Sequence, residues 1–181
     1  MKKRCSWCNQ DKIYKKYHDE EWWVLNLNEN HLFEMIILEW QQAGLSWLTI
    51  LKKRENYRKI FYNFNLKKIS EIWEKEMMKI LKNPLIIRNK LKIKSIIYNA
   101  KYFLEIQKEF WSFQKYLNNF TEWKIFQFLN WEVETKLSKK ISKDLKKRWF
   151  KFIWSKIIFS YLEAIWIYNN HQKDCFLYKK I

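Results

Sequence analysis

Apolar residues recur three and four positions apart along most of this chain. Because an α-helix has 3.6 residues per turn, this spacing places the apolar side chains on one helix face. The clearest such stripe comprises Ile93, Ile96, Ile97, Ala100, Phe103 and Leu104. No segment shows a convincing alternation of apolar and polar residues, the pattern of a half-buried strand. The sequence therefore predicts an all-α fold.

Local signals suggest where several of these helices begin and end. Gly44 can end a helix in the left-handed conformation, and Ser46 is placed to cap the start of the next helix. The stretch 111–138 carries no readable pattern. Beyond the clearest stripe, the sequence predicts helices over residues 31–43, 47–57, 77–81, 140–148 and 158–165.

Length and composition limit the class of protein. A chain of 181 residues with 48% hydrophobic residues can bury a sizeable core, and no linker or repeat divides it. We therefore expect a single domain over residues 1–181, and a monomer. No apolar run approaches the roughly 18 residues that span a bilayer, so no membrane association is expected. The N-terminus does not resemble a signal peptide, and with three cysteines the expected compartment is the reducing cytoplasm.

The chain is strongly basic, with 36 Lys and Arg against 19 Asp and Glu and a formal net charge of +17. Such a surplus favours binding to the phosphate backbone of nucleic acids, because neutralised phosphates release counterions. The alternative is a codon bias, since Lys, Ile, Asn, Phe and Tyr have AT-rich codons. Charge alone leaves both interpretations open.

Cysteine and histidine residues near the two ends of the chain could form a metal site. The motif CSWC supplies Cys5 and Cys8, while His171 and Cys175 lie four residues apart near the C-terminus. With His18, two thiolates and two imidazoles would make a closed tetrahedral site, typical of structural zinc. Cys8 competes with Cys5 for this role, and unliganded thiols are the simpler alternative.

Aromatic residues gather in the first 50 positions together with one carboxylate, that of Glu39. Aromatic faces beside a carboxylate suit a flat, cationic heterocycle held by stacking and cation–π attraction. The alternative is an aromatic core in which Glu39 faces solvent. The aromatic residues are Trp7, Tyr14, Tyr17, Trp22 and Trp47.

Longer motifs resemble the 3-methyladenine DNA glycosylase I family nearly from end to end. The resemblance is carried by YHDEEW, LFEMIILEWQQAGLSWLTILKKRENYRKIF, IIRNKLKI, DLKKRWFKF and NNHQKDC. It implies a helix-hairpin-helix DNA glycosylase-like bundle, with the helix-hairpin-helix region at about residues 74–107. It also implies a structural Zn²⁺ site formed by segments 5–18 and 171–175. The implied activity is hydrolysis of the N-glycosidic bond of 3-methyladenine in alkylated double-stranded DNA, as part of base excision repair.

The resemblance also assigns residues. The metal ligands fall on Cys5, His18, His171 and Cys175, which leaves Cys8 as a bystander. The base-reading carboxylate falls on Glu39, with Tyr17 and Trp47 as stacking partners and Trp7, Tyr14 and Trp22 completing the wall.

The expected chemistry follows from the substrate. The alkylated base is already cationic, so an ionised Glu39 would favour it over neutral adenine. No lysine is placed to suggest Schiff-base chemistry, so a monofunctional enzyme that leaves an abasic site is expected.

The predicted hairpin departs from the usual pattern, in which glycine N–H groups approach a phosphate. The segment NPLIIRNKLK at 83–92 has no glycine. Its polar side chains could still contact the DNA backbone, and they are Arg88, Asn89, Lys90 and Lys92.

The chain has one glycine and 12 tryptophans. Against the family pattern, six tryptophans stand where glycine is expected, namely Trp23, Trp40, Trp111, Trp149, Trp154 and Trp166. One common cause would be a UGA codon that the organism reads as glycine. Divergence of a decayed gene and deliberate redesign are the alternatives. Trp73, Trp123 and Trp131 are not assigned to either group.

Two other functions compete with the glycosylase. One is a catalytically inactive, zinc-stabilised DNA-binding protein in which Trp40 occludes the base pocket. The other is a structural helical protein whose charge reflects codon bias alone. The space beside Glu39 distinguishes the first of these from an active enzyme.

Overall fold

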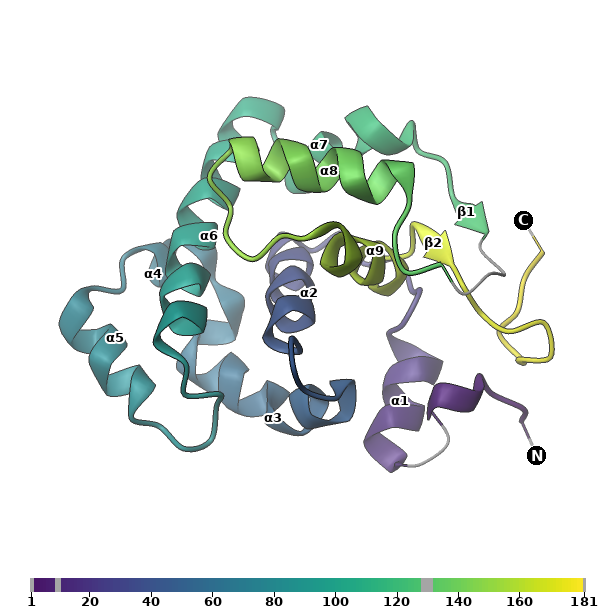
Figure 1. Cartoon of the computed structure of the whole chain (residues 1–181), viewed down its shortest axis with the longest axis horizontal. Coiled ribbons are helices and arrows are strands. Elements are labelled where there is room, and N and C mark those ends of the chain that lie inside the picture. Colours follow the sequence, from purple (N-terminus) through teal and green to yellow (C-terminus); the bar gives the residue numbers. More distant parts are fainter. Residues whose placement is uncertain (1, 9–10, 128–131, 181) are drawn as a thin grey trace.

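Helix α2 (Glu29–Gln41) lies at the centre of the molecule, with the other helices arranged around it (Figure 1). The computed structural model describes residues 2–8, 11–127 and 132–180. Every residue of α2 from Leu32 to Gln41 is buried. A helix that is apolar on most sides needs neighbours on most sides, so α2 forms the centre of the hydrophobic core.

The regular structure of the described residues is almost entirely helical, which confirms the all-α prediction. The remaining helices are α1 (Lys12–Glu20), α3 (Trp47–Ile60), α4 (Leu66–Ser70), α5 (Glu74–Leu81), α6 (Lys90–Phe110), α7 (Phe113–Thr121), α8 (Lys136–Lys147) and α9 (Ser155–Ala164), with 3₁₀ turns η1 (Ser6–Cys8) and η2 (Tyr62–Phe64). Two short strands, β1 (Phe126–Gln127) and β2 (Tyr168–Asn169), pair in parallel.

Short polar side chains cap several helices where the sequence predicts it. Ser46 Oγ accepts a hydrogen bond from the backbone N–H of Thr49 at 3.2 Å, so α3 begins at Trp47. Gly44 has a φ of 81°, the left-handed conformation predicted for it. These two residues make the tight connection between α2 and α3.

An ion-pair network fixes α3 against α2. The guanidinium of Arg54 donates to both carboxylate oxygens of Glu34, at 2.8 and 3.2 Å. Arg58 donates to the same carboxylate at 2.7 and 3.1 Å. Because paired guanidinium groups satisfy both oxygens, burial of Glu34 is tolerated, and the second half of α3 is held against α2.

The structure differs from the sequence-based expectation in its shorter elements. Helices α1, α4 and α7 carry too few apolar positions to stand out, and α7 lies in the stretch 111–138 that gave no pattern. Helix α8 begins at Lys136, four residues before the predicted start, because Thr135 and Ser138 form a capping box. Trp131 lies outside the described residues.

Within the described ranges, no helix combines the length and the apolar character needed to cross a bilayer.

Candidate active site and metal centre

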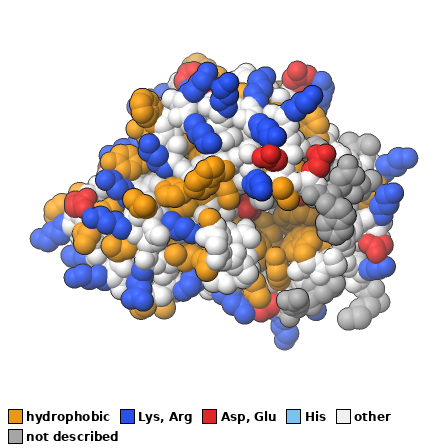
Figure 2. Space-filling model, viewed as in Figure 1, with side chains coloured by type: hydrophobic (Ala, Val, Ile, Leu, Met, Phe, Trp, Pro, Cys, Tyr) orange, Lys and Arg blue, Asp and Glu red, His pale blue; other side chains and the backbone are white. Residues whose placement is uncertain are grey.

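A cleft of about 450 Å³ opens beside the N-terminal end of α3. Figure 2 shows this face hollowed between α1 and α9, with hydrophobic side chains inside the hollow. The cleft brings together all six residues expected to form the base pocket, namely Trp7, Tyr14, Tyr17, Trp22, Glu39 and Trp47. Four separate elements, η1, α1, α2 and α3, together with the turn after α1, supply them.

The aromatic side chains form two groups along the cleft. The rings of Tyr17 and Trp47 lie 5.4 Å apart between centroids, at an interplanar angle of 58°. Trp7 contacts Tyr14 at 5.0 Å and Trp22 at 4.9 Å. Rings locked against one another lose little freedom when a flat ligand enters, so the walls are preorganised for stacking.

Glu39 is the deepest acid in the cleft and is 5% exposed. Burial raises the pKa of its carboxyl well above the usual range, and the charge of Glu163 raises it further. Burial therefore disfavours the ionised form of Glu39 that the sequence analysis expects. A cation placed against it would favour the ionised form, so proton loss from Glu39 and cation binding are coupled.

Hydrogen-bond donors accompany this acid. Burial, followed by the charge of Glu39, raises the pKa of the Tyr17 phenol, which therefore stays protonated. The indole Nε1 of Trp47 is buried and has no partner among the described atoms. A buried donor without a partner is costly, so a ligand that accepts this N–H would be favoured.

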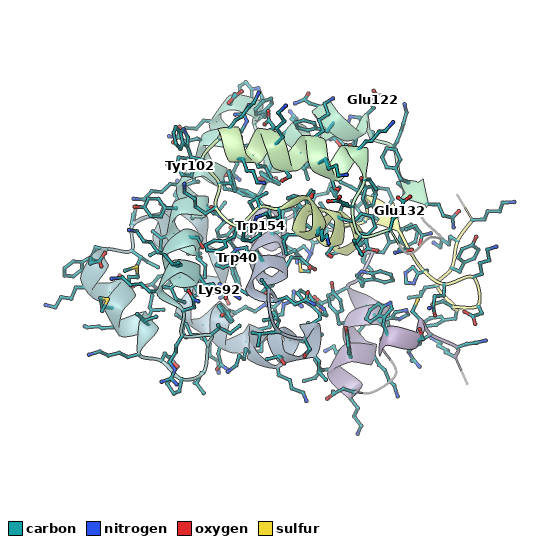
Figure 3. The ribbon with its side chains drawn as sticks, in the orientation of Figure 1. Trp40, Lys92, Tyr102, Glu122, Glu132 and Trp154 are labelled. Carbon is teal, nitrogen blue, oxygen red and sulfur yellow. The ribbon has the colours of Figure 1, made fainter. Side chains whose placement is uncertain are left out.

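Trp40 follows Glu39 in α2 but does not line the cleft. Its side chain is fully buried and stacks on Phe152, with ring centroids 4.9 Å apart and planes 10° from parallel. Trp40 and Trp154 lie close together in Figure 3, and the Phe152 ring contacts both. Occlusion of the cleft by Trp40, the condition for the inactive alternative, is not found.

The four predicted metal ligands converge although 166 positions separate Cys5 from His171. One ligand atom from each of Cys5, His18, His171 and Cys175 lies within 4.8 Å of the others, and all four residues are buried. The closest approaches are 3.4 Å between His18 Nε2 and Cys175 Sγ, and 3.6 Å from His171 Nδ1 to each sulfur. Two thiols and two imidazoles at these separations form a group that can bind a metal ion.

A second layer of contacts supports this group. Asp19 Oδ1 lies 2.8 Å from His18 Nδ1, which leaves Nε2 of the same ring facing Cys175. Arg4 donates to both oxygens of Asp19 and holds the carboxylate in place. A carboxylate on the far nitrogen is the usual support of a metal-binding histidine. Cys8 stands apart, because its thiol donates to the Cys5 carbonyl oxygen at 3.1 Å.

The residues expected to contact the DNA backbone lie around the start of α6. Arg88 and Lys90 are exposed, and no ion pair among the described residues involves them. Asn89 caps α6 by accepting from the backbone N–H of Lys92 at 3.0 Å. Lys92 Nζ donates to the carbonyl oxygens of Gln41 and Ala43, at 2.8 and 3.0 Å, so its charge is committed to the end of α2.

One functional candidate is absent from the sequence-based set. Glu163 on α9 lines the cleft with Glu39, and its Oε1 accepts from Asn170 Nδ2 at 2.7 Å. A glutamate within an apolar helix face is the signal that could have identified it, but residues 158–165 read simply as a core stripe.

Comparison with known proteins agrees with this arrangement. The family model described as "Methyladenine glycosylase" matches residues 7–178. DNA-3-methyladenine glycosylase 1 of Escherichia coli (strain K12) is 39% identical over 182 residues, covering 97% of this chain and 96% of that protein.

The fold is also similar to solved structures of 3-methyladenine DNA glycosylases. The crystal structure of a 3-methyladenine DNA glycosylase I has a TM-score of 0.93 at 39% identity, covering 98% of this chain and 100% of that chain. The Staphylococcus aureus 3-methyladenine DNA glycosylase I, solved to show 3-methyladenine recognition, has a TM-score of 0.92 at 33% identity, covering 98% and 97%. This chain therefore belongs to the methyladenine glycosylase family.

Proposed function

We propose that the protein is a monofunctional DNA glycosylase that hydrolyses the N-glycosidic bond of 3-methyladenine in alkylated double-stranded DNA. The observation that carries the proposal is the open aromatic cleft with Glu39 at its base. Family membership supports the same reaction. Chemistry on a base within a duplex requires that the nucleotide be flipped out of the stack into such a cleft.

The cleft residues suit a cationic base. Tyr17 and Trp47 supply aromatic surface against which the base stacks, while Trp7, Tyr14 and Trp22 complete the wall. Glu39 accepts hydrogen bonds from the amine edge of the base and becomes ionised as the cation enters. Neutral adenine offers no charge to offset the burial of this carboxylate, so binding discriminates against it.

The metal group, in this proposal, holds structural Zn²⁺. Cys5, His18, His171 and Cys175 supply a closed tetrahedral set, and the ion would join segments that lie at opposite ends of the chain. The ligand residues leave no open position, so zinc serves to hold the cleft wall in shape. The three free thiols suit a reducing cytoplasm.

DNA binding is assigned to the basic residues at the start of α6. Arg88 and Lys90 are exposed and available to phosphates. Asn89 caps α6 and so positions the N-terminal end of that helix toward the backbone. Lys92 contributes by holding the start of α6 against the α2–α3 connection. The proposed helix-hairpin-helix unit of about residues 74–107 would comprise α5, the loop after it and most of α6. The protein is proposed to act as a monomer, with one glycosylase domain over residues 1–181.

Release of free base tests the activity. Purified protein is incubated with methylated duplex DNA, and the released bases are separated and identified. Release of 3-methyladenine with abasic sites left in unbroken strands is the expected result. Strand cleavage would contradict a monofunctional enzyme, and absence of free base would contradict the activity itself.

A further inference from the structure

Glu163 is a second carboxylate in the same hollow as Glu39, supplied by a different helix. It lines the aromatic cleft and also an adjoining cavity of about 540 Å³. The adjoining cavity extends along Gly44, Leu45 and Lys156, away from the aromatic wall. Glu163 is half-buried, whereas Glu39 is 5% exposed, so Glu163 lies nearer the opening.

One oxygen of Glu163 is available to a ligand. Oε1 accepts from Asn170 Nδ2 at 2.7 Å, which orients the carboxylate. Among the described residues no hydrogen bond or ion pair occupies Oε2, although Lys156 and Lys173 border the two cavities. The carboxylate is thus held by one oxygen and free to act with the other.

The position relative to the proposed substrate suggests the role. The sugar of a flipped nucleotide stays joined to the DNA backbone, so a base held in the aromatic cleft leaves its deoxyribose toward the opening. Breaking the bond places positive charge on the sugar and requires a water molecule at its C1′ atom. A carboxylate near the opening can orient that water and stabilise the developing charge.

We infer that Glu163 is a second functional carboxylate of the cleft, which orients the attacking water and accepts its proton. This inference rests on the proposed function. A water oxygen forms the bond to C1′ as the bond from C1′ to the base breaks. The bonding pair goes to the base, which leaves as a neutral molecule. The water proton passes to Glu163 and then to solvent.

The environment of Glu163 is compatible with this step. Burial raises the pKa of its carboxyl to about 7. A base is most effective when its pKa lies near the working pH, so this group can accept a proton near neutrality and release it again.

The test separates chemistry from base binding. Glu163→Gln keeps the hydrogen bond that Asn170 donates but cannot take up a proton. We expect its single-turnover release of 3-methyladenine from methylated duplex DNA to fall about 100-fold. Its affinity for free 3-methyladenine, measured by calorimetry, should be unchanged. Glu132→Gln is the control, since Glu132 is an exposed acid at the adjoining cavity (Figure 3) and should retain the full rate.

Other outcomes overturn the inference in distinguishable ways. An undiminished rate in Glu163→Gln removes the role while leaving the proposed function intact. If Glu163→Gln lost rate and affinity for 3-methyladenine to the same extent, Glu163 would instead support base binding by acting on Glu39. Wild-type protein that releases no base overturns the proposed function and this inference together.

A second, independent observation concerns the tryptophans. Ten non-glycine residues of the described chain have positive φ, and five of them are Trp23, Trp111, Trp123, Trp149 and Trp166. Side chains other than glycine adopt this region at a cost, because Cβ crowds the backbone. Four of the five belong to the six positions expected to be glycine, and Trp123 adds one that the sequence pattern did not place.

Helix ends explain two of these conformations. The N–H of Trp149 donates to the Lys146 carbonyl at 3.0 Å, and that of Phe150 to the Leu145 carbonyl at 3.0 Å. This pair of bonds is the Schellman motif, whose left-handed residue is usually glycine. Trp166 ends α9 similarly, with Ile167 donating to the Leu162 carbonyl at 2.9 Å.

The geometry points to glycine as the native residue at positions 23, 111, 123, 149 and 166, with UGA codons read as glycine in the source organism. At positions 40 and 154 the expectation of glycine rests on the family resemblance alone, because Trp40 is helical and Trp154 has a φ of −80°.

Peptide mass spectrometry of protein purified from its own organism decides the matter. Glycine at the five positions is the expected result, and tryptophan there overturns the inference. Denaturation of the chain as printed gives a second readout. Trp149→Gly should raise its unfolding midpoint, whereas Trp73→Gly, at an equally exposed site with a φ of −96°, should not. No difference between these two variants would contradict the backbone argument.

Discussion

The ring of Trp22 lies against His171, with centroids 4.5 Å apart and planes at 75°. Trp22 is part of the cleft wall, and His171 belongs to the metal-ligand group. Trp7 makes a similar contact with His18, at 5.3 Å. The wall that would hold a base therefore rests directly on the residues that would hold zinc.

If the group holds zinc as proposed, loss of the ion should damage the cleft as well as the ends of the chain. We expect Asp19→Asn to weaken zinc affinity about 10- to 100-fold, because it removes the carboxylate that orients His18. Competition with a chromophoric chelator measures this affinity. Asp174→Asn is the matched control, since Asp174 pairs with the exposed Lys3 and should leave affinity unchanged. Equal affinity in Asp19→Asn would mean that His18 is oriented by packing alone.

Glu39→Gln should separate activity from stability. Excision of 3-methyladenine is expected to fall on the order of 100-fold, because the neutral amide cannot stabilise the cationic base. The unfolding temperature should rise slightly, since the burial that raises the pKa of Glu39 also makes its charge costly. Parallel excision assays and thermal melts measure the two effects. Glu34→Gln, which breaks the pairs with Arg54 and Arg58, should instead lower the melting temperature.

Salt dependence tests the assignment of the DNA-binding residues. The logarithm of DNA affinity should fall steeply with the logarithm of salt concentration, and Arg88→Ala or Lys90→Ala should each reduce the slope by about 1. Fluorescence anisotropy with a labelled duplex measures these slopes. Lys108→Ala lies at the opposite end of α6 and pairs with Glu105, so its slope should match that of wild type. A flat wild-type dependence would contradict backbone binding altogether.

The pKa of Glu163 predicts how stability changes with pH. Its folded pKa is about 7 against an ordinary 4.5, so the folded state binds more protons between these values. Stability contributed by this group is therefore present at low pH and lost as pH rises from about 4.5 to 7, by about 3 kcal/mol at most. Urea unfolding across this range should show a smaller decline in Glu163→Gln than in wild type. Identical declines would mean that Glu163 titrates normally in the folded protein.

The sequence predicted the long elements and most of the cleft. Helices α2 and α6 were identifiable because a long buried face repeats its apolar spacing over several turns. Short helices such as α7 depend on packing against neighbours, and local spacing contains little of that information. The role of Glu39 came from the family resemblance, since an acid at the edge of an apolar run fits a solvent-facing position equally well.

Residues brought together from distant parts of the chain were the hardest to foresee. The spacing of Cys5, Cys8 and His18 left the choice of ligands open, and the resemblance alone selected Cys5. Glu163 was missed because its importance depends on where α9 packs against α2. Lys92 was one of four candidates for phosphate contact, and the sequence did not indicate that its ammonium donates to the carbonyl groups at the end of α2.

That contact of Lys92 has a mechanical consequence. Its ammonium ties the first turn of α6 to the carbonyl oxygens of Gln41 and Ala43, immediately before Gly44. The contact therefore opposes displacement of the proposed backbone-binding residues relative to the loop at the edge of the cleft.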